Sequence, residues 1–595
     1  MQLRRLKLRF RRDFRKRKKQ VEGIGLQAES QLERNFFRRF DSLLKVRRFA
    51  GTWMLLVILL IGCVVAQTRG LGGYYQTLQP APGGIYTEGI LGSYTDANPV
   101  YATGEVDQAV SRLIFAGLLK YNDKNQLSGD LAQSWYAQDD GKQYVVHLRP
   151  NLTWQDGQPL TANDVVFTFQ VIQSPDAQSP LQSSWQGVTV TATDSQTVVF
   201  TLPNPLASFP YSLTTGIIPQ HLLGSIPMDQ MRSAAFNTTK PVGAGPFVLK
   251  DLEVAGDTPQ TREEQIALRP FRNYWAGRPL LDSFVVHAFT TQQLMLNSFK
   301  HQNINAMVGL SSLPQNLAKD SSVQAYQMPL TAGNYVFFKT SSGVLADAKV
   351  RQALVQGADP SAIIGQLGYP TTPVDEPLLR KQLAYDAKYR QLGYDQAAAA
   401  KELTADGWIP GANGIRYKKN LPLTFNLFAQ DTTEYSMVTR RLAQEWQSLG
   451  VDVQVHLQSG TDLQPTLESH SYDALLYGIS IGVDPDVFVY WDSSQADIRA
   501  AGRLNFSEYK SSTADTALEA GRTRTDPTLR VIKYGPFLQS WQQDAPALGL
   551  YQPRFLYVTR GPVSGLSEHT INTDTGRYDN VQNWEIREIP TTVKQ

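Results

Sequence analysis

The chain has 595 residues, 42% hydrophobic and 19% charged, which is enough apolar material for more than one core in a globular protein. The net charge of +3 is unevenly spread: residues 1–48 carry 17 Lys and Arg against 5 Asp and Glu, and this +12 leaves −9 for the rest. A single cysteine, Cys63, excludes an intramolecular disulfide framework and a cysteine-based zinc site, and the seven histidines are scattered.

The first 48 residues form a basic segment, and we expect it to be a cytoplasmic tail. Phenylalanines stand between its charges, at Phe10, Phe14, Phe36, Phe37 and Phe40. This mixture fits a peptide lying on anionic lipid at the inner leaflet, or a topogenic tail without a partner of its own. Charge alone also permits nucleic acid as a partner, but no feature predicts specific nucleic-acid binding.

The uncharged run 49–66, FAGTWMLLVILLIGCVVA, follows this tail. Eighteen residues at helical rise span about 27 Å, close to the thickness of a thin bilayer. The long basic segment favours an uncleaved transmembrane anchor, with the N-terminus cytoplasmic and the main domain outside the cell membrane. The alternative is a signal whose residues 60–63 resemble a lipobox with Cys63 acylated, although Val64 to Ala66 continue the apolar run.

Residues 67–84 combine Gly, Pro and Gln with little apolar periodicity, and we expect a spacer there. The folded part is expected to begin near Ile85. From there to the end we find no repeat of 20 to 50 residues, which argues against a solenoid or a propeller.

Short strands and helices alternate through the folded part. Residues 144–157 predict a strand that ends in a turn at Asp156–Gly157, and Thr161 or Asn163 is expected to cap a helix that starts at Asp164. Residues 188–202 predict two strands joined by a polar turn. Further on, the chain predicts a strand over 423–430, an amphipathic helix over 435–450 and a strand over 451–458. This order is the unit of a parallel sheet, so the predicted class is α/β.

One long motif connects the chain to a known family. Its residues are Leu131–Trp135, Asp140–Lys142, His147–Arg149, Trp154, Asp156–Gly157, Pro159–Ala162 and Asp164–Phe167. More landmarks follow at Pro241–Phe247, Arg272–Trp275, Asp347–Leu354, Ala400–Leu403, Asp484–Pro485 and Asn505–Phe506. Over about residues 85–570 the chain resembles the family 5 extracellular solute-binding proteins, which serve oligopeptide, dipeptide and nickel ABC importers.

The resemblance implies a two-lobed fold like that of type II periplasmic binding proteins, with an extra subdomain in the first lobe. The family layout places the first lobe at 85–290 with 536–595, the small subdomain at 119–184 and the second lobe at 291–535. The implied function is capture of a peptide or a similar small ligand between the lobes and its delivery to ABC permease subunits. The implied protein is not an enzyme and needs no cofactor.

Peptide-binding members of the family also suggest where the ligand lies. An extended peptide pairs as an added strand, since main-chain hydrogen bonds give affinity without recognising side chains. By resemblance, the pairing strand falls at Tyr477, Gly478 and Ile479, and the facing first-lobe loop at Thr103, Gly104 and Glu105. Aromatic residues near the implied cleft, Tyr490 and Trp491, are further candidates for its lining.

One position departs from the family pattern. Members that take free peptides carry an Asp for the ligand's amino group about three residues before the Asp-Pro pair, and the matching residue here is Ile481. A buried ammonium without a counter-charge is costly, so Glu105, Asp484 or Asp486 would have to take that role. Nickel or haem would require exposed His or Arg in the cleft, and no metal site is predicted.

Two other functions remain open from the sequence. The pattern Gly478-Ile-Ser480-Ile-Gly482, with His569 downstream, matches the nucleophile elbow of a serine hydrolase, but the elbow requires a helix immediately after the serine, where Gly482 to Pro485 disfavour one. The second alternative is a tethered ligand sensor of the same fold, which signals through the basic tail. No P-loop, dinucleotide fingerprint, HExxH or EF-hand sequence occurs.

Overall fold

The computed structural model describes residues 47–592 except residues 75, 257, 259, 260, 498, 500 and 501. The predicted basic tail therefore lies almost wholly outside the described residues. Two compact units divide the chain: residues 1–79 with 588–595 form one, and residues 80–587 form the other.

The smaller unit contains helix α3 (Arg47–Tyr74) and most of the two-stranded sheet of β1 (Gln76–Ala81) and β23 (Arg587–Thr592). Regular structure thus occupies much of the predicted spacer 67–84, because α3 continues to Tyr74 and β1 follows it. Local composition could not show this, since the partner strand of β1 comes from the far end of the chain. None of the helices in the described part of the chain combines the length and the apolar character needed to cross a membrane.

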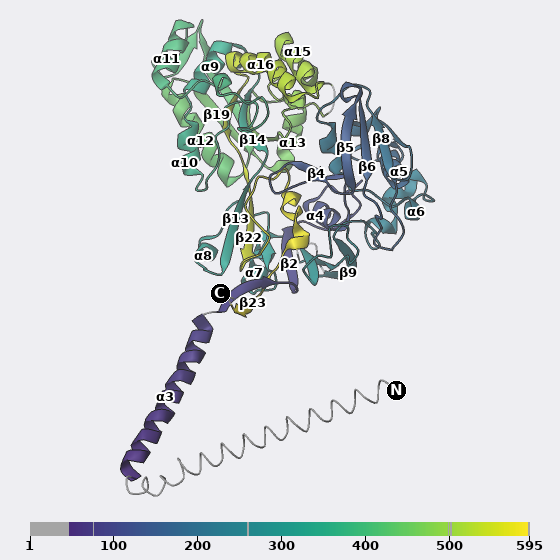
Figure 1. The fold of residues 1–595 in the computed structure, drawn as a ribbon. Coiled ribbons are helices and arrows are strands. Elements are labelled where there is room, and N and C mark those ends of the chain that lie inside the picture. The colour runs from purple at the N-terminus through teal and green to yellow at the C-terminus, as the bar shows by residue number, and fades with distance from the viewer. Residues whose placement is uncertain are drawn as a thin grey trace. The chain divides into compact units, whose positions relative to one another are not determined.

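A seven-stranded sheet forms the base of the larger unit (Figure 1). Its order is β13 (Val323–Pro329), β22 (Arg554–Arg560), β12 (Ala306–Met307), β2 (Ile85–Leu91), β11 (Ser283–Phe289), β10 (Glu263–Pro270) and β9 (Phe247–Ala255). β2 runs parallel to both of its neighbours, β11 and β12, whereas the outer pairs are antiparallel. The carboxyl ends of these three central strands therefore meet at one edge.

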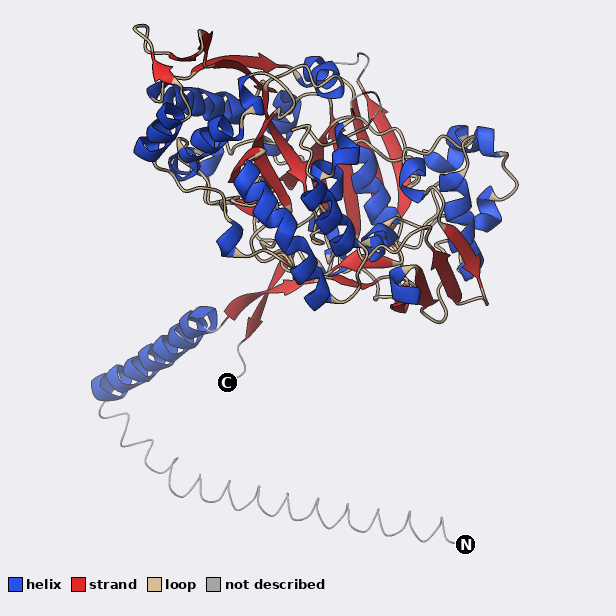
Figure 2. Ribbon diagram, turned by 90° about the horizontal axis from the view of Figure 1, so that it is seen from above, coloured by secondary structure: helices blue, strands red, loops and turns tan. Residues whose placement is uncertain are grey.

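A five-stranded sheet has the order β19 (Asp452–Gln458), β18 (Thr424–Gln430), β20 (Ala474–Ser480), β14 (Ala332–Phe338) and β21 (Ala547–Tyr551). β18, helix α12 (Thr433–Ser448) and β19 form the predicted strand, helix and strand, and the two strands pair in parallel. Side chains on the two faces of this sheet enter different cores. One face packs on helices α9 (Ala348–Gln356), α11 (Gln396–Ala405) and α12, and the other on α13 (Gly460–Glu468), α15 (Ser512–Arg522) and α16 (Pro527–Asp544). Figure 2 shows helices against the strands, as the α/β prediction requires.

A separate four-stranded sheet lies between β2 and β9 in the sequence, in the order β5 (Ala132–Gln138), β6 (Gln143–Leu148), β8 (Thr197–Thr201) and β7 (Thr189–Ala192). β7 and β8 confirm the two strands predicted over 188–202, whereas β6 ends at Leu148 and covers only the first part of the strand predicted over 144–157. Helix α5 (Ala162–Gln173) begins two residues before the predicted Asp164. Thr161, one of the two predicted caps, is its N-cap, and the Thr161 side chain and the Asp164 carboxylate form a reciprocal capping box. This sheet extends to Thr201, beyond the predicted subdomain end at residue 184.

The remaining elements are shorter or connect the sheets. The helices are α4 (Glu105–Ile114), α6 (Gln220–Leu223), α7 (Gln292–Lys300), α8 (Gln315–Ala318), α9 (Ala348–Gln356), α10 (Pro360–Gln366), α11 (Gln396–Ala405), α13 (Gly460–Glu468), α14 (Phe488–Trp491), α15 (Ser512–Arg522) and α16 (Pro527–Asp544). The small sheets are β3 (Leu119–Tyr121) with β4 (Leu127–Gly129), and β15 (Ile409–Pro410) with β16 (Arg416–Lys418) and β17 (Leu421–Pro422).

Two short segments carry the chain from the seven-stranded to the five-stranded sheet and back. Leu330 and Thr331 join β13 to β14, while Gln552 and Pro553 join β21 to β22. The segments lie side by side, since the Leu330 amide donates to the Pro553 carbonyl at 2.9 Å. β12 and β13 follow residue 290 but pair within the seven-stranded sheet, and β21 follows residue 535 but pairs within the five-stranded sheet. The chain therefore changes sheet later than the predicted lobe boundaries at 290 and 535, because local sequence does not show which strands pair.

Candidate functional site

A cavity of about 270 Å³ lies where residues of both large sheets meet. Its lining comprises Ile90, Glu105, Gln108, Val308, Ser480, Asn572, Thr573, Asp574, Thr575 and Arg577. Two larger hollows of about 520 Å³ lie elsewhere. One is lined by residues of β2, β10, β11 and the segment 294–303, and the other by residues near β9 and β10 together with Gln155 and Asp156. Of these three spaces, the smaller cavity is the one lined by residues of both large sheets.

The cavity lies at the carboxyl ends of parallel strands. Ile90 is near the end of β2, Val308 directly follows β12, and Ser480 is the last residue of β20, which runs parallel to β18. Ligands in α/β proteins collect at such strand ends, because the loops there are free to vary while the strands hold them rigidly.

The second half of β20 is paired on one side only within the described residues. β14 pairs with all of β20, but β18 pairs only with Ala474–Leu476. Tyr477 to Ser480 therefore keep an unpaired edge that leads toward the cavity, and a backbone edge of this kind accepts an added strand. Gly478 is packed closely on its neighbours, since a Cβ there would lie 2.7 Å from the Asn334 Oδ1 atom.

The structure brings part of the sequence-predicted site to this cavity. Glu105 lines it from the first turn of α4, and Thr103 and Gly104 are exposed just before that helix. Tyr477, Gly478 and Ile479 lie in β20 next to Ser480. Tyr490 is close to the same strand end, because its hydroxyl donates to the Ser480 carbonyl at 2.7 Å.

Three other candidates lie elsewhere. Ile481 is 7% exposed and packs in the hydrophobic core beside the five-stranded sheet. Trp491 is fully buried in the same core, with its ring 5.7 Å from Phe337. The Asp484 carboxylate accepts two hydrogen bonds from Arg530, at 2.6 and 2.7 Å, so its charge is already balanced.

Two arginines hold the elements that carry the cavity's carboxylates. Arg112 on α4 forms an ion pair with Asp579 at 3.0 Å and so fastens α4 to the chain just after the 3-10 turn Asp574–Tyr578. Arg577 from that turn forms an ion pair with Glu88 on β2 at 2.5 Å, and both side chains are almost fully buried. The positions of Glu105 and Asp574 are thereby fixed relative to the sheet.

The two carboxylates hold protons more tightly than ordinary Asp and Glu. Loss of water around the Glu105 carboxylate and the nearby Asp574 charge both raise the pKa of Glu105. Burial also raises the pKa of Asp574, although Arg577 opposes the change. The Arg577 charge opposes the rise in pKa at both carboxylates.

The loop after β8 of the four-stranded sheet contacts two segments that follow β20, away from the cavity. The Ser208 hydroxyl donates to the Asp486 Oδ2 atom at 3.0 Å, and the Ala207 amide donates to the Arg522 carbonyl at 2.9 Å. Arg522 and Asp486 themselves form an ion pair at 3.2 Å. The loop after β8 therefore contacts the start of the segment after β20, with Asp486 already bound to a cation.

Ser480 does not stand on a nucleophile elbow. β20 ends at this residue, and the next helix, α14, begins only at Phe488. The downstream His569 has its Nδ1 atom 2.9 Å from the Ser567 carbonyl. The strand, sharp turn and helix that expose a catalytic serine are therefore not formed here. Among the described residues, no group of three or more His, Cys, Asp and Glu is arranged to hold a metal ion.

Sequence reasoning missed several residues of the cavity: Ile90, Gln108, Val308, Asn572, Thr573, Asp574, Thr575 and Arg577. Residues 571–580, INTDTGRYDN, are polar and near the end of the chain, which gave no reason to connect them with α4 or β20. Ser480 also lines the cavity, but the sequence indicated it only as the serine of the hydrolase-like pattern.

Two α/β lobes joined by two crossing segments, with a cavity between them, define a solute-binding protein. Residues 126–499 match the family model for bacterial extracellular solute-binding proteins, family 5 Middle. The chain belongs to this family.

Known proteins resemble the chain over most of its length. The oligopeptide-binding protein AppA of Bacillus subtilis is 24% identical over 513 residues, which cover 84% of this chain and 92% of the relative. The structure of AppA with a nonapeptide has a TM-score of 0.66 at 23% identity, covering 86% of this chain and all of that one. NikZ of Campylobacter jejuni in complex with Ni(L-His) has a TM-score of 0.70 at 22% identity, covering 84% of this chain and 99% of that one.

Proposed function

We propose that this protein captures peptides outside the cell, next to the membrane, and delivers them to an ABC importer. The half-paired strand β20, whose free edge leads into the cavity between the lobes, is the observation that carries the peptide assignment. AppA, which matches the chain in sequence and fold, is an oligopeptide-binding protein, and this supports the same ligand class.

The free edge suits ligands of varied sequence. A peptide laid along Tyr477–Ser480 would exchange main-chain hydrogen bonds with β20, and these bonds do not depend on side-chain identity. Side chains of such a ligand would alternate between the two faces of the added strand, with those on one face directed into the cavity. Affinity and broad specificity thus come from separate parts of the ligand.

Closure would complete the site. We propose that the lobes rotate about the crossing segments at 330–331 and 552–553, where the chain changes sheet. Glu105 and Ser480 face the cavity from different lobes, so a ligand contacts both only when the cleft is narrow. A ligand therefore favours the closed form, which an importer can distinguish from the open one.

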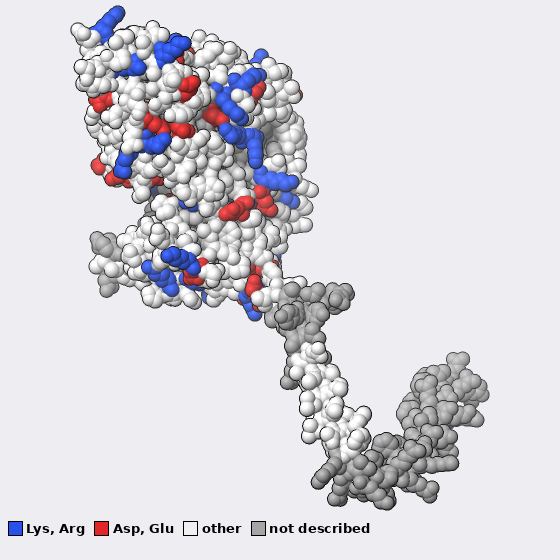
Figure 3. Space-filling view, turned by 90° about the vertical axis from the view of Figure 1, so that its left-hand side faces the viewer, with Lys and Arg blue, Asp and Glu red and all other residues white. Residues whose placement is uncertain are grey.

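We also propose that the run 49–66 tethers the protein to the membrane. Twelve large apolar side chains between Phe49 and Val65 are exposed all around α3, and Figure 3 shows no charged side chain on its described part. A helix that is apolar on every face needs an apolar environment. The uncharged run in the sequence has eighteen residues. The side chain of one of them, Ala50, is not among those that the structure describes.

Mass spectrometry tests the ligand class. The full chain would be purified in detergent micelles from the cells that make it, and its native spectrum compared with a spectrum after denaturation. We expect a series of peptide masses that is bound in the first spectrum and released in the second. A single non-peptide mass would overturn the peptide assignment and leave solute binding intact.

A ligand sensor is the second candidate, favoured by the basic segment 1–48, which an importer subunit does not need. Deletion of the protein distinguishes the two functions. Loss of peptide uptake in the deletion strain supports import, whereas normal uptake with a lost response to external peptide supports sensing.

A further inference from the structure

A fully buried carboxyl group lies in the segment 371–391, between α10 and α11. The Glu376 side chain is 0% exposed, and neither of its carboxyl oxygens has a hydrogen-bond partner among the residues that the structure describes. No group of three or more His, Cys, Asp and Glu in the described part of the chain is arranged to bind a metal ion there. Because an ionised carboxylate is strongly disfavoured in such surroundings, Glu376 carries a proton.

The charged neighbours of Glu376 do not balance an ionised form. The groups that act on its charge are Asp375, Tyr385, Asp386 and Arg390 from its own segment, and Tyr335 from β14. The Asp375 carboxylate is bound to both Arg380 and Arg390, so the positive charge of Arg390 already has a partner. Burial raises the pKa of Glu376 to about 8, and the two aspartates add to the rise.

The segment that contains Glu376 contacts one crossing segment directly. The Thr371 hydroxyl donates to the Gln552 carbonyl, and the Gln552 amide donates to the Thr372 carbonyl at 2.9 Å. Gln552 belongs to the connection from β21 to β22. Packing around Glu376 therefore bears on one of the two points where the chain changes sheet.

The same segment reaches the other crossing segment through the loop after β20. The Gln382 Nε2 atom donates to the Gly482 carbonyl at 2.8 Å, and the Gly482 amide donates to the Thr331 carbonyl at 2.9 Å. The Tyr335 hydroxyl also donates to the Glu376 carbonyl at 2.9 Å, which fastens Glu376 to β14, the strand that follows Thr331. Both crossing segments are thus connected to the surroundings of one buried carboxyl group.

We propose that the proton on Glu376 keeps the segment 371–391 packed against the crossing segments, so that rising pH loosens this segment and shifts the balance between the closed and the open lobes. The inference rests on the proposed function only for the movement of the lobes about the crossing segments. It adds a regulation by pH that does not depend on the identity of the solute.

The direction of the pH effect follows from the difference between the two states. In the loosened state water reaches Glu376, and its pKa returns to the ordinary value of 4.5. Because the packed state holds the proton more tightly, each pH unit between about 4.5 and 8 favours the loosened state by up to about tenfold. Above about pH 8 the carboxyl group is ionised in both states, and the balance stops changing.

Spin labels on the two lobes measure this balance without any ligand. The full chain would carry Cys63→Ser with Lys300→Cys on α7 and Lys401→Cys on α11, two exposed positions on helices that pack on different large sheets. Pulsed electron spin resonance in detergent micelles gives the distance between the labels from pH 6 to pH 9.5. We expect a second distance whose share grows up to about tenfold per pH unit and becomes constant near pH 8. A share that stays constant between pH 6 and pH 8 would overturn the proposal.

Two variants identify the responsible group. Glu376→Gln has the shape of the protonated acid and cannot ionise, so its distances should not change with pH. Glu519→Gln replaces an exposed carboxylate on α15 and should behave like the unsubstituted chain. A pH-dependent distance that persists in Glu376→Gln would overturn the role of Glu376 and leave the movement of the lobes intact.

Hydrogen exchange of residues 371–391 supplies the second measurement. We expect faster exchange in the wild type than in Glu376→Gln at the same pH, with a difference that grows from pH 6 to pH 8. Faster exchange without a change in the label distance would overturn the connection to the lobes. None of these results depends on which solute binds, so a failure of this inference leaves peptide capture intact, and the mass spectra test that function separately.

Discussion

The buried ion pair between Glu88 and Arg577 stabilises the wall of the cavity. Glu88 is 0% exposed and accepts hydrogen bonds from the Arg577 Nε atom at 2.8 Å and from the Tyr578 hydroxyl at 2.9 Å. The Tyr557 hydroxyl donates to the same carboxylate at 3.2 Å. Because all of these groups are buried, a group that loses its hydrogen-bond partner cannot form a hydrogen bond with water instead.

We expect Glu88→Gln to lower the free energy of unfolding by about 3–5 kcal/mol, since it leaves the Arg577 charge buried and unpaired. Urea denaturation of the full chain in detergent micelles, followed by tryptophan fluorescence, measures the change. Tyr557→Phe removes only a hydroxyl group from the same network and should cost about 1 kcal/mol. A loss below about 1 kcal/mol for Glu88→Gln would mean that Arg577 finds another partner.

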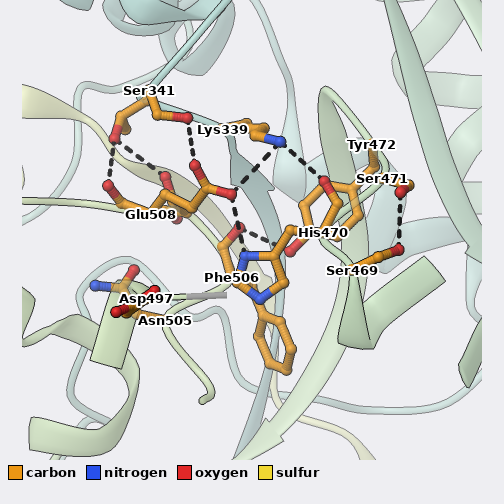
Figure 4. Close-up of polar contacts among 12 residues, drawn as sticks. Lys339, Ser341, Ser469, His470, Ser471, Tyr472, Asp497, Asn505, Phe506 and Glu508 are labelled. Atoms are coloured by element: carbon orange, nitrogen blue, oxygen red, sulfur yellow. Dashed lines mark hydrogen bonds and ion pairs between the residues drawn. The ribbon is translucent and has the colours of Figure 1, made fainter. Parts of the chain in front are cut away.

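At the scale of elements, a buried polar network fastens the start of β20 to β14. Figure 4 shows the Glu508 carboxylate between Ser341, Lys339 and His470. The His470 Nδ1 atom lies 3.3 Å from Glu508 Oε1, and Lys339 donates to the His470 carbonyl at 2.9 Å. His470 lies in the turn between α13 and β20 and has a positive φ of 48°, which is uncommon for residues other than glycine. The side-chain contacts of His470 help to stabilise this turn.

The network predicts a pH dependence of stability. Burial lowers the pKa of His470, although Glu508 opposes the shift. The unfolded chain therefore takes up a proton more readily, and stability should fall as pH drops below about 6.5, the ordinary value for histidine. His470→Asn, which tolerates the positive φ, should reduce the slope between pH 7 and 5 by at most about 1.4 kcal/mol per pH unit.

Urea denaturation of the full chain in detergent micelles across this pH range measures the slope. His456→Asn is the matched control, because His456 is an exposed histidine on β19. An equal slope in the wild type and His470→Asn would show that other groups determine the acid sensitivity.

At the scale of the whole molecule, the proposed tether assigns separate roles to the two compact units. The larger unit contains the cavity and both lobes, and the smaller contains α3. We expect the full chain to stay with the membrane pellet after alkaline extraction. Leu56→Arg with Leu59→Arg should release it, since each charge near the centre of a spanning helix costs about 2.5–3.5 kcal/mol.

Cys63→Ser distinguishes the two forms of attachment. An uncleaved anchor keeps the variant in the pellet, whereas attachment through an acylated Cys63 would release it to the supernatant. Retention of the double arginine variant in the pellet would show that α3 is not what holds the protein there. Gln67→Arg, just beyond the apolar run, should leave the distribution unchanged.

Local sequence was sufficient for the features that depend on neighbouring residues. Alternating and helical apolar patterns predicted β18, α12 and β19 as a parallel unit, and Thr161 with Asp164 indicated the start of α5. The motif from Leu131 to Phe167 predicted the family, because its turns and packing positions recur at fixed spacing. The resemblance also implied that Tyr477, Gly478 and Ile479 form the ligand strand, and this stays a prediction.

The tertiary structure alone decided which distant residues meet. Glu105 and Asp574 are far apart in the sequence, yet both line one cavity because α4 and the turn at Asp574–Tyr578 are fastened to the same part of the seven-stranded sheet. The pairing of β1 with β23 and the late change of sheet at 330–331 have the same origin. Periodicity reports which face of an element is buried, but the partner that buries it is chosen by the energy of the whole fold.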